Sequence, residues 1–220
     1  MTRIMIYDGP AAEDAAITRT GGLPLLPADV EWPRCAACKG NMQFLARIQQ
    51  DGTFVDEHGE PTGDRRVVQV FMCENDPGMC ETWEAHSGAN AVIVLPPDPA
   101  PVRQAPPEGV TTLAEVSSVR LFETDVEPTE EFSHPYEAAR EAWAEDPGKR
   151  GRDVLGQLGG SPSWLQSHRA LGCRECAAPL RFVAQLEEGH DSGTTANYGG
   201  GSAYVHICPT HDQGAFLWQQ

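Results

Sequence analysis

The chain has 220 residues, of which 32 are acidic and 16 are basic, so its formal net charge is −16 at pH 7. This balance argues against sequence-independent nucleic-acid binding, because phosphate contacts need clustered Lys and Arg side chains. It favours the attraction of a basic partner. No apolar run approaches the roughly 20 residues of a membrane span, and the first ten residues lack the pattern of a signal peptide. We therefore expect a cytoplasmic protein that does not bind membranes.

The pattern along the chain predicts a β-dominated α+β fold, organised as one two-lobed domain over residues 1–220. A first repeat is expected over residues 18–95. Within it, residues 42–49, 67–73 and 89–95 are rich in β-branched and apolar residues and predict strands. A polar region with three glycines and a proline separates the first two of these strands, which is typical of a turn.

Residues 96–151 are expected to form a proline-rich linker, a strand and an acidic helix. Six prolines lie within residues 96–107, so this stretch is predicted to be extended. A strand is predicted over 116–123, and a helix over 135–146. Ser133 or His134 can cap this helix, Pro135 suits its first position, and Glu137 adds a favourable charge near its N-terminus.

A second repeat is expected over residues 152–220. It opens with a predicted helical turn over 153–158. Two strands follow, over 180–186 and 202–208, on either side of a glycine-rich loop.

The two repeats align with each other. Residues 21–48 match residues 159–186 without a gap at an offset of 138, and residues 68–73 match 203–208 at an offset of 135. Both copies read Gly-Gly-x-Pro, Cys-x-x-Cys, strand, loop, and a strand ending in Cys. This order predicts an internal duplication that gives two pseudo-equivalent lobes.

All seven cysteines fit two metal sites, one in each repeat. Two thiolates in Cys-x-x-Cys can converge on one ion, and a tetrahedral ion then needs two more ligands. Thiolate-rich sets favour zinc, and four protein ligands make a zinc ion structural because no coordination position stays open for water. The sequence therefore predicts two structural Zn²⁺ ions. The predicted ligands are Cys35, Cys38, Cys73 and Cys80 for the first ion, and Cys173, Cys176, Cys208 and His211 for the second.

Two alternatives concern individual ligands. His86 can replace Cys80, because Cys80 lies in an irregular stretch, and His206 can replace His211 if the strand end twists. Redox-active or simply buried cysteines are the alternatives for the sites as a whole.

Several segments of the chain resemble segments of a known protein family. Residues 20–27 (Thr-Gly-Gly-Leu-Pro-Leu-Leu-Pro), Trp32-Pro33 and residues 42–48 are similar to the opening of the YwqG-like bacterial proteins, a family of unknown function. Residues 158–166, 180–186 and 205–208 resemble that family's second half. The chain more distantly resembles the eukaryotic programmed cell death protein 2 family, ribosome-assembly factors that escort a newly made ribosomal protein. The resemblance implies a peptide-binding groove between the lobes, shaped by aromatic and Gly-Gly positions.

No nucleophile elbow, phosphate loop or dinucleotide fingerprint is present in the sequence. We expect a non-catalytic, zinc-stabilised, chaperone-like protein that holds a basic or extended segment of a client protein. Leu26, Trp32 and Trp164 are candidates to line the lobes, although a core position is the preferred interpretation for each of them taken singly. Glu137 and Glu141 share a face of the acidic helix and are candidates to attract basic residues. The alternatives are an immunity or antitoxin-type protein that masks a basic toxin, and an enzyme with an unrecognised site.

Overall fold

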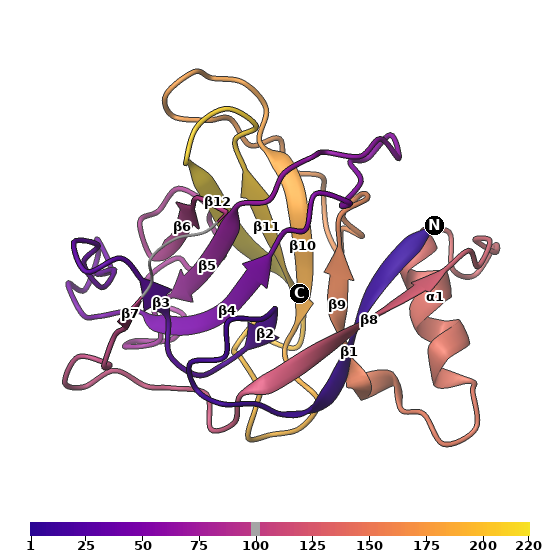
Figure 1. Ribbon diagram of the computed structural model, residues 1–220, viewed down its shortest axis with the longest axis horizontal. Coiled ribbons are helices and arrows are strands. Elements are labelled where there is room, and N and C mark those ends of the chain that lie inside the picture. The colour runs from indigo at the N-terminus through magenta and orange to yellow at the C-terminus, as the bar shows by residue number, and fades with distance from the viewer. Residues whose placement is uncertain (98–101) are drawn as a thin grey trace.

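The computed structural model describes residues 1–97 and 102–220, and its main element is one antiparallel sheet of ten strands (Figure 1). The order across this sheet is β12-β11-β10-β9-β1-β8-β2-β4-β5-β6. The predicted β-dominated class is therefore confirmed. In chain order the strands are β1 (Thr2–Pro10), β2 (Arg19–Thr20), β4 (Gln43–Gln49), β5 (Val67–Met72), β6 (Asn90–Leu95), β8 (Ser117–Thr124), β9 (Val154–Leu158), β10 (Arg181–Glu187), β11 (Ser202–Ile207) and β12 (Gly214–Gln219).

The sheet curls until its two edge strands, β6 and β12, lie beside each other, so it forms a nearly closed barrel (Figure 1). The Asn90 side chain donates from Nδ2 to the carbonyl of Phe216 across the seam (3.1 Å). Gly214 lies so close to Val92 that a Cβ at this position would meet the Val92 side chain at 2.4 Å. Contact between the edges leaves neither strand free to pair with another chain along its whole length.

Two halves of the chain meet in this barrel. We call residues 18–95 the first half and residues 152–220 the second half. At the centre of the sheet, β1 pairs with β8, while β1 also pairs with β9 of the second half and β8 with β2 of the first. The interior is one shared apolar core, which includes Leu45, Val70, Val183 and Val205, each at most 1% exposed.

The helix α1 (Pro135–Ala144) packs against the outside of the barrel, close to the N-terminus (Figure 1). His134 caps it, as one of the two predicted residues, because its Nδ1 accepts a hydrogen bond from the main-chain N–H of Tyr136 (3.1 Å). Tyr136, Ala139 and Trp143 recur on one face at helical spacing and are buried against apolar residues of β1. Among the described residues no helix has the length and apolar character needed to cross a membrane.

A second, two-stranded sheet pairs β3 (Leu25–Leu26) with β7 (Val102–Arg103). The predicted extended stretch over 96–107 falls partly on residues 98–101, which lie outside the described residues. Its described C-terminal part, β7, is extended as expected.

All six predicted strands are confirmed to within one or two residues, but the helical turn predicted over 153–158 is wrong. A single 3₁₀ turn, Gly151–Asp153, precedes β9, which is fully buried between β1 and β10. Pairing on both edges and burial of every residue outweigh the weak local helix signal. The sequence prediction also lacked β1, β2, β3 and β12.

Candidate metal centres

The four cysteines predicted for the first site lie together at one end of the first half. Cys35 and Cys38 come from the loop ahead of β4, Cys73 directly follows β5, and Cys80 lies in the next loop. Their sulfur atoms are all within 4.8 Å of one another, and Cys38 Sγ is 3.6 Å from Cys73 Sγ. Sulfurs bound to one tetrahedral zinc ion at about 2.3 Å are separated by about 3.8 Å, so this cluster has the size of a metal site.

The four residues predicted for the second site are gathered in the same way. Cys176 Sγ is 3.8 Å from Cys208 Sγ, and the Nδ1 atom of His211 is 3.5 Å from Cys208 Sγ and 4.0 Å from Cys173 Sγ. The four ligand atoms again lie within 4.8 Å of one another. The structure therefore contains two clusters that could each hold a metal ion.

The Cys-x-x-Cys loops of the two sites have matching turns. Lys39 N donates to Cys35 O (3.0 Å), and Ala177 N donates to Cys173 O (2.9 Å). Lys39 and Ala177 both have a positive φ, 65° and 58°, which is uncommon for residues other than glycine. These two residues are 138 positions apart, so the tight turn that brings each cysteine pair together occurs at matching positions of the two halves.

Hydrogen-bond donors beside the sulfur atoms favour the anionic, metal-binding form, whereas burial opposes it, and burial prevails at Cys73 and Cys173, whose pKa is raised. Asn75 Nδ2 lies 3.2 Å from Cys73 Sγ, and Thr210 Oγ1 lies 3.5 Å from Cys208 Sγ. Burial alone would raise the pKa of the Cys208 thiol, but hydrogen bonds from Thr210 and from His211 outweigh it and lower this pKa to about 5. Burial and the neighbouring sulfurs raise the pKa of the Cys80 thiol.

His211 is oriented for coordination through Nδ1. Its other ring nitrogen, Nε2, faces the Glu175 carboxylate at 3.8 Å. A carboxylate on the far side of a histidine ring is the usual outer partner of a metal-binding imidazole, since it fixes the ring and its tautomer.

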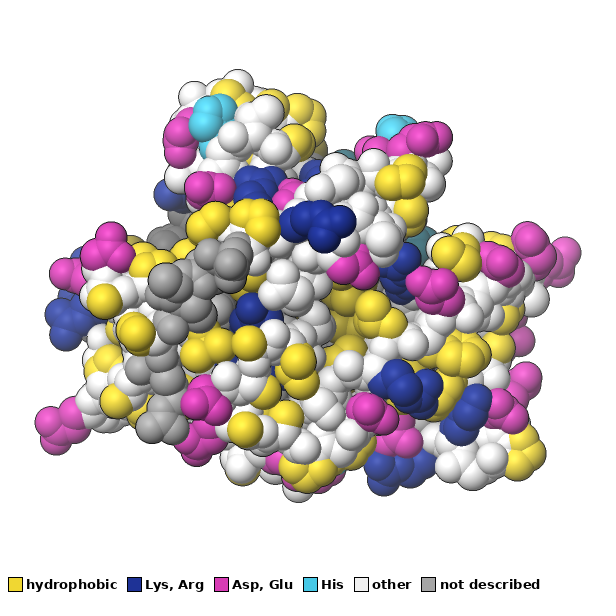
Figure 2. Space-filling view, in the orientation of Figure 1, with side chains coloured by type: hydrophobic (Ala, Val, Ile, Leu, Met, Phe, Trp, Pro, Cys, Tyr) yellow, Lys and Arg dark blue, Asp and Glu magenta, His cyan; other side chains and the backbone are white. Residues whose placement is uncertain are grey.

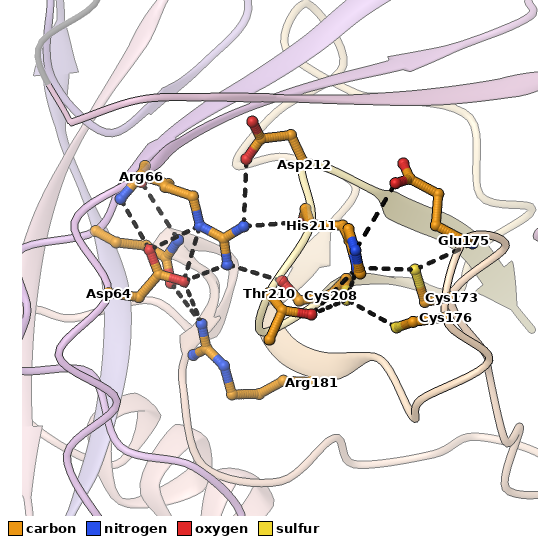
Figure 3. Close-up of polar contacts among 11 residues, drawn as sticks. Asp64, Arg66, Cys173, Glu175, Cys176, Arg181, Cys208, Thr210, His211 and Asp212 are labelled. Carbon is orange, nitrogen blue, oxygen red and sulfur yellow. Dashed lines mark hydrogen bonds and ion pairs between the residues drawn. The ribbon is translucent and has the colours of Figure 1, made fainter.

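A partly buried ion-pair network ties the second cluster to the first half of the chain (Figure 3). Arg66, just ahead of β5, donates to the main-chain carbonyls of His211 (2.9 Å) and Cys208 (2.8 Å). Asp64 pairs with both Arg66 and Arg181 at 2.7 Å. Burial alone would raise the pKa of Asp64, but the hydrogen bonds and charge of Arg66 lower it below its ordinary value. Nothing in the sequence pattern predicted this network, because Asp64 and Arg66 lie far along the chain from Arg181 and from the ligand loop that Arg66 contacts.

The alternative ligands lie outside the two clusters. Cys80 completes the first group, while the main-chain carbonyl of His86 accepts a hydrogen bond from Arg174 (3.0 Å). His206 is 4% exposed on β11 and stacks under Trp164 with ring centroids 5.8 Å apart. His211 completes the second group.

The residues predicted to contact a client are placed differently from one another. Leu26 and Trp32 are buried in the core of the first half, and Trp32 donates from Nε1 to Met42 O (2.7 Å). Trp164 is partly exposed and lines a groove of about 840 Å³. The sequence pattern indicated Trp164, and the resemblance implied a groove between the lobes. The place of this groove could not be derived from residue spacing, because loops from both halves line it.

The acidic helix contributes to a second cavity. Glu141 is exposed, whereas Glu137 is partly buried and accepts a hydrogen bond from Ser163 Oγ (2.7 Å). Both glutamates line a cavity of about 450 Å³ beside α1, together with Glu131 and Arg140.

No protein-family model matches the chain. A stretch of 67 residues is 34% identical to the uncharacterized protein YpfL of Salmonella typhimurium. The match covers 30% of this chain and 15% of that protein, so the chain spans only a small part of the length of the curated relative it matches. This relative is itself uncharacterized and assigns no activity, and the resemblance to the YwqG-like proteins stays a prediction.

Proposed function

We propose that the two clusters hold two structural Zn²⁺ ions, and that this chain is a non-catalytic, zinc-stabilised protein that binds a basic or extended segment of a client protein. The observation that carries the metal assignment is the donor set: four thiolates in one cluster, and three thiolates with an imidazole in the other, at the spacing of tetrahedral ligands. Soft ligands in this geometry select zinc over magnesium or calcium.

Each ion would be held by four protein atoms, which leaves no position for water or substrate and gives zinc a stabilising role. Metal binding of this kind contributes on the order of 10 kcal/mol to folding. The matched positions of the two sites, each closing the end of a hairpin, suggest that both ions stabilise the barrel in the same way.

We also infer that the chain arose by internal duplication. Contacts at the 138-residue offset support it: Gly21 N donates to Leu45 O (2.7 Å), and Gly159 N donates to Val183 O (2.8 Å). Both hairpins, β4–β5 and β10–β11, shift register at this same point, immediately after Phe44 and Phe182. Shared irregularities are stronger support than shared strands, because a β-bulge is a specific local feature.

The acidic cavity beside α1 supports a basic client. Glu131, Glu137 and Glu141 line it, and the single cation among its lining residues, Arg140, forms an ion pair with Glu187 (3.4 Å). The cavity therefore has an excess of negative charge that an arginine or lysine of a client would neutralise. Figure 2 shows acidic and basic side chains interspersed over the visible face, so long-range attraction there comes mainly from the net charge of −16.

The test is a titration of a fluorescein-labelled, arginine-rich peptide followed by fluorescence anisotropy. We expect binding to weaken as NaCl rises from about 50 to about 300 mM, since exposed charges are screened. Glu141→Lys should weaken it by roughly 2- to 10-fold. Glu108→Lys, which changes the net charge equally at another exposed position, is the control. Binding that ignores salt, or equal effects of the two variants, would contradict the proposal.

A further inference from the structure

In the first half, an extended segment of the chain itself is paired with β3. Leu26 is opposite Val102 in this two-stranded sheet, and Gln104 N donates to Pro24 O (3.3 Å). The Gln104 side chain also donates from Nε2 to the carbonyls of Pro27 (3.3 Å) and Val30 (2.8 Å). The outward edge of β3 is therefore occupied.

The second half contains a counterpart of β3 at residues 162–164, offset by 138 from residues 24–26. Its inner side is held in the same manner. In the first half the carbonyl of Leu25 accepts a hydrogen bond from the Gln69 side chain (2.8 Å), and in the second half the carbonyl of Ser163 accepts one from the Tyr204 hydroxyl (2.8 Å). Gln69 and Tyr204 are themselves offset by 135, as the second strands of the repeats are.

The outward edge of this counterpart has no strand on it. Among the residues that the structure describes, no protein group forms a hydrogen bond with the Pro162 carbonyl or with the main chain of Trp164. Leu165, the next residue, is 49% exposed. A main-chain edge with an exposed apolar neighbour is the arrangement to which an added strand binds.

A groove of about 840 Å³ runs along this edge. Part of its lining is aromatic, and charged residues such as Asp56 and Arg181 lie around this part. Trp164 stacks on His206 and lies tilted against the Tyr204 ring, with ring centroids 4.4 Å apart, and Phe182 packs edge-on against His206. These side chains lie on the face of β10 and β11 opposite the barrel core, since neighbouring Val183 and Val205 point into that core.

We propose that this groove binds an extended segment of a client protein, which adds a strand to residues 162–164 as β7 adds a strand to β3. The occupant would have the chemistry of the segment around β7: an uncharged amide side chain at its centre and prolines on its flanks. Prolines keep such a segment extended and favour contact with an aromatic lining. This inference rests on the proposed client-binding function and gives it a location and a mode of recognition.

The amide side chain is part of the proposal because of the loops that follow each edge. The loop after β3 gives two carbonyls to Gln104, and the loop after residue 164 has the same length and is exposed over residues 165–168. A glutamine on the added strand can donate to main-chain carbonyls there as Gln104 does in the first half.

The probe is a synthetic peptide with the sequence Pro-Val-Arg-Gln-Ala-Pro-Pro, which copies residues 101–107. The outward edge of β3 is already paired with the chain's own β7, so only the edge at residues 162–164 of the second half is open to the peptide. Isothermal titration calorimetry at about 150 mM NaCl should give a dissociation constant on the order of 100 µM. A peptide methylated on the glutamine main-chain nitrogen should bind about fivefold more weakly, because it lacks the counterpart of the bond from Gln104 N to Pro24 O. This comparison leaves the protein unchanged.

Two protein variants complete the test. Trp164→Ala should weaken binding of the unmodified peptide by about tenfold or more. Trp83→Ala, which removes a partly buried tryptophan outside the groove, should leave binding unchanged. The proposal is overturned if the protein binds neither peptide or binds both with equal affinity, or if the two variants change the affinity equally. It is also overturned if the protein has a doubled molecular mass in solution, with the groove filled by a second copy. The arginine-rich peptide separates the two ideas: if it still binds in a salt-dependent manner, the proposed function stands and only the strand groove is rejected.

Discussion

Arg66 is the residue whose replacement tests most directly how the second metal cluster is anchored. Its guanidinium holds two main-chain carbonyls of the ligand loop, at Cys208 and His211, and pairs with Asp64. Arg66→Met keeps most of the side-chain volume but removes the charge and all of these hydrogen bonds. The carbonyls and the carboxylate would then lose their shared partner.

The expected cost follows from the burial of this network. The Asp64 and Arg66 side chains are only 10% and 14% exposed, and breaking a buried pair by removing one partner costs about 3–5 kcal/mol. Arg181 still pairs with Asp64 at 2.7 Å, so we expect the lower end, about 3 kcal/mol. For a chain of this length that loss corresponds to a fall in melting temperature of roughly 6–12 °C.

Differential scanning calorimetry of the zinc-loaded protein measures this loss, and transfer of zinc to a chromophoric chelator measures how firmly the ligand loop holds its ion. Arg65→Met is the matched control, since Arg65 is exposed. We expect Arg66→Met to melt at a lower temperature and to release one of its two zinc ions faster. If both variants melt together and release zinc at the wild-type rate, the anchoring role of Arg66 is refuted.

Three further predictions concern the first site, the core and the loss of stability at acidic pH. Cys80→Ser should reduce bound zinc from two ions to one per chain, whereas His86→Ala should keep two by plasma mass spectrometry, and a loss in His86→Ala would reverse the assignment. Leu45→Ala should cost about 2–5 kcal/mol in one transition seen equally by fluorescence and circular dichroism, because both halves share a core, and two separate transitions would disprove this. Because the pKa of Asp64 is lowered in the folded protein, the carboxylate's contribution to stability is present above the unfolded-state pKa of about 4. This contribution is lost as the pH falls through the folded-state pKa. The free energy of unfolding of Asp64→Asn, measured with urea, should therefore depend less on pH below about 5 than that of the wild type. Parallel pH profiles of the two proteins would contradict the assignment.

The local pattern was enough to predict the hairpins and the two ligand sets. Alternating and continuous apolar residues marked β4, β5, β10 and β11, and each strand that ends in cysteine brings its thiol to the end of a hairpin where a Cys-x-x-Cys loop returns. A metal site depends on a few side chains of definite chemistry at short spacing. The helix α1 was also predictable, because its capping residue and first-turn proline lie next to each other in the sequence.

The remaining parts of the fold depend on pairing between strands that are distant in the sequence, and the local pattern could not predict them. The segment 153–158 was interpreted as a helical turn, but β9 is formed by pairing with β1 and β10, whose residues are far away in the sequence. Leu26 and Trp164 lie at matching positions, 138 residues apart, yet Leu26 is buried beside β7 and Trp164 lines an open groove. What separates them is β7, which covers only the first half.

X-ray absorption spectroscopy of the protein purified without chelators tests the two-site account most directly. The account predicts two zinc ions per chain, sharing seven sulfur ligands and one nitrogen, with zinc–sulfur distances of about 2.3 Å. A protein that carries no tightly bound metal, or whose ions have oxygen-rich shells with bound water, would contradict it.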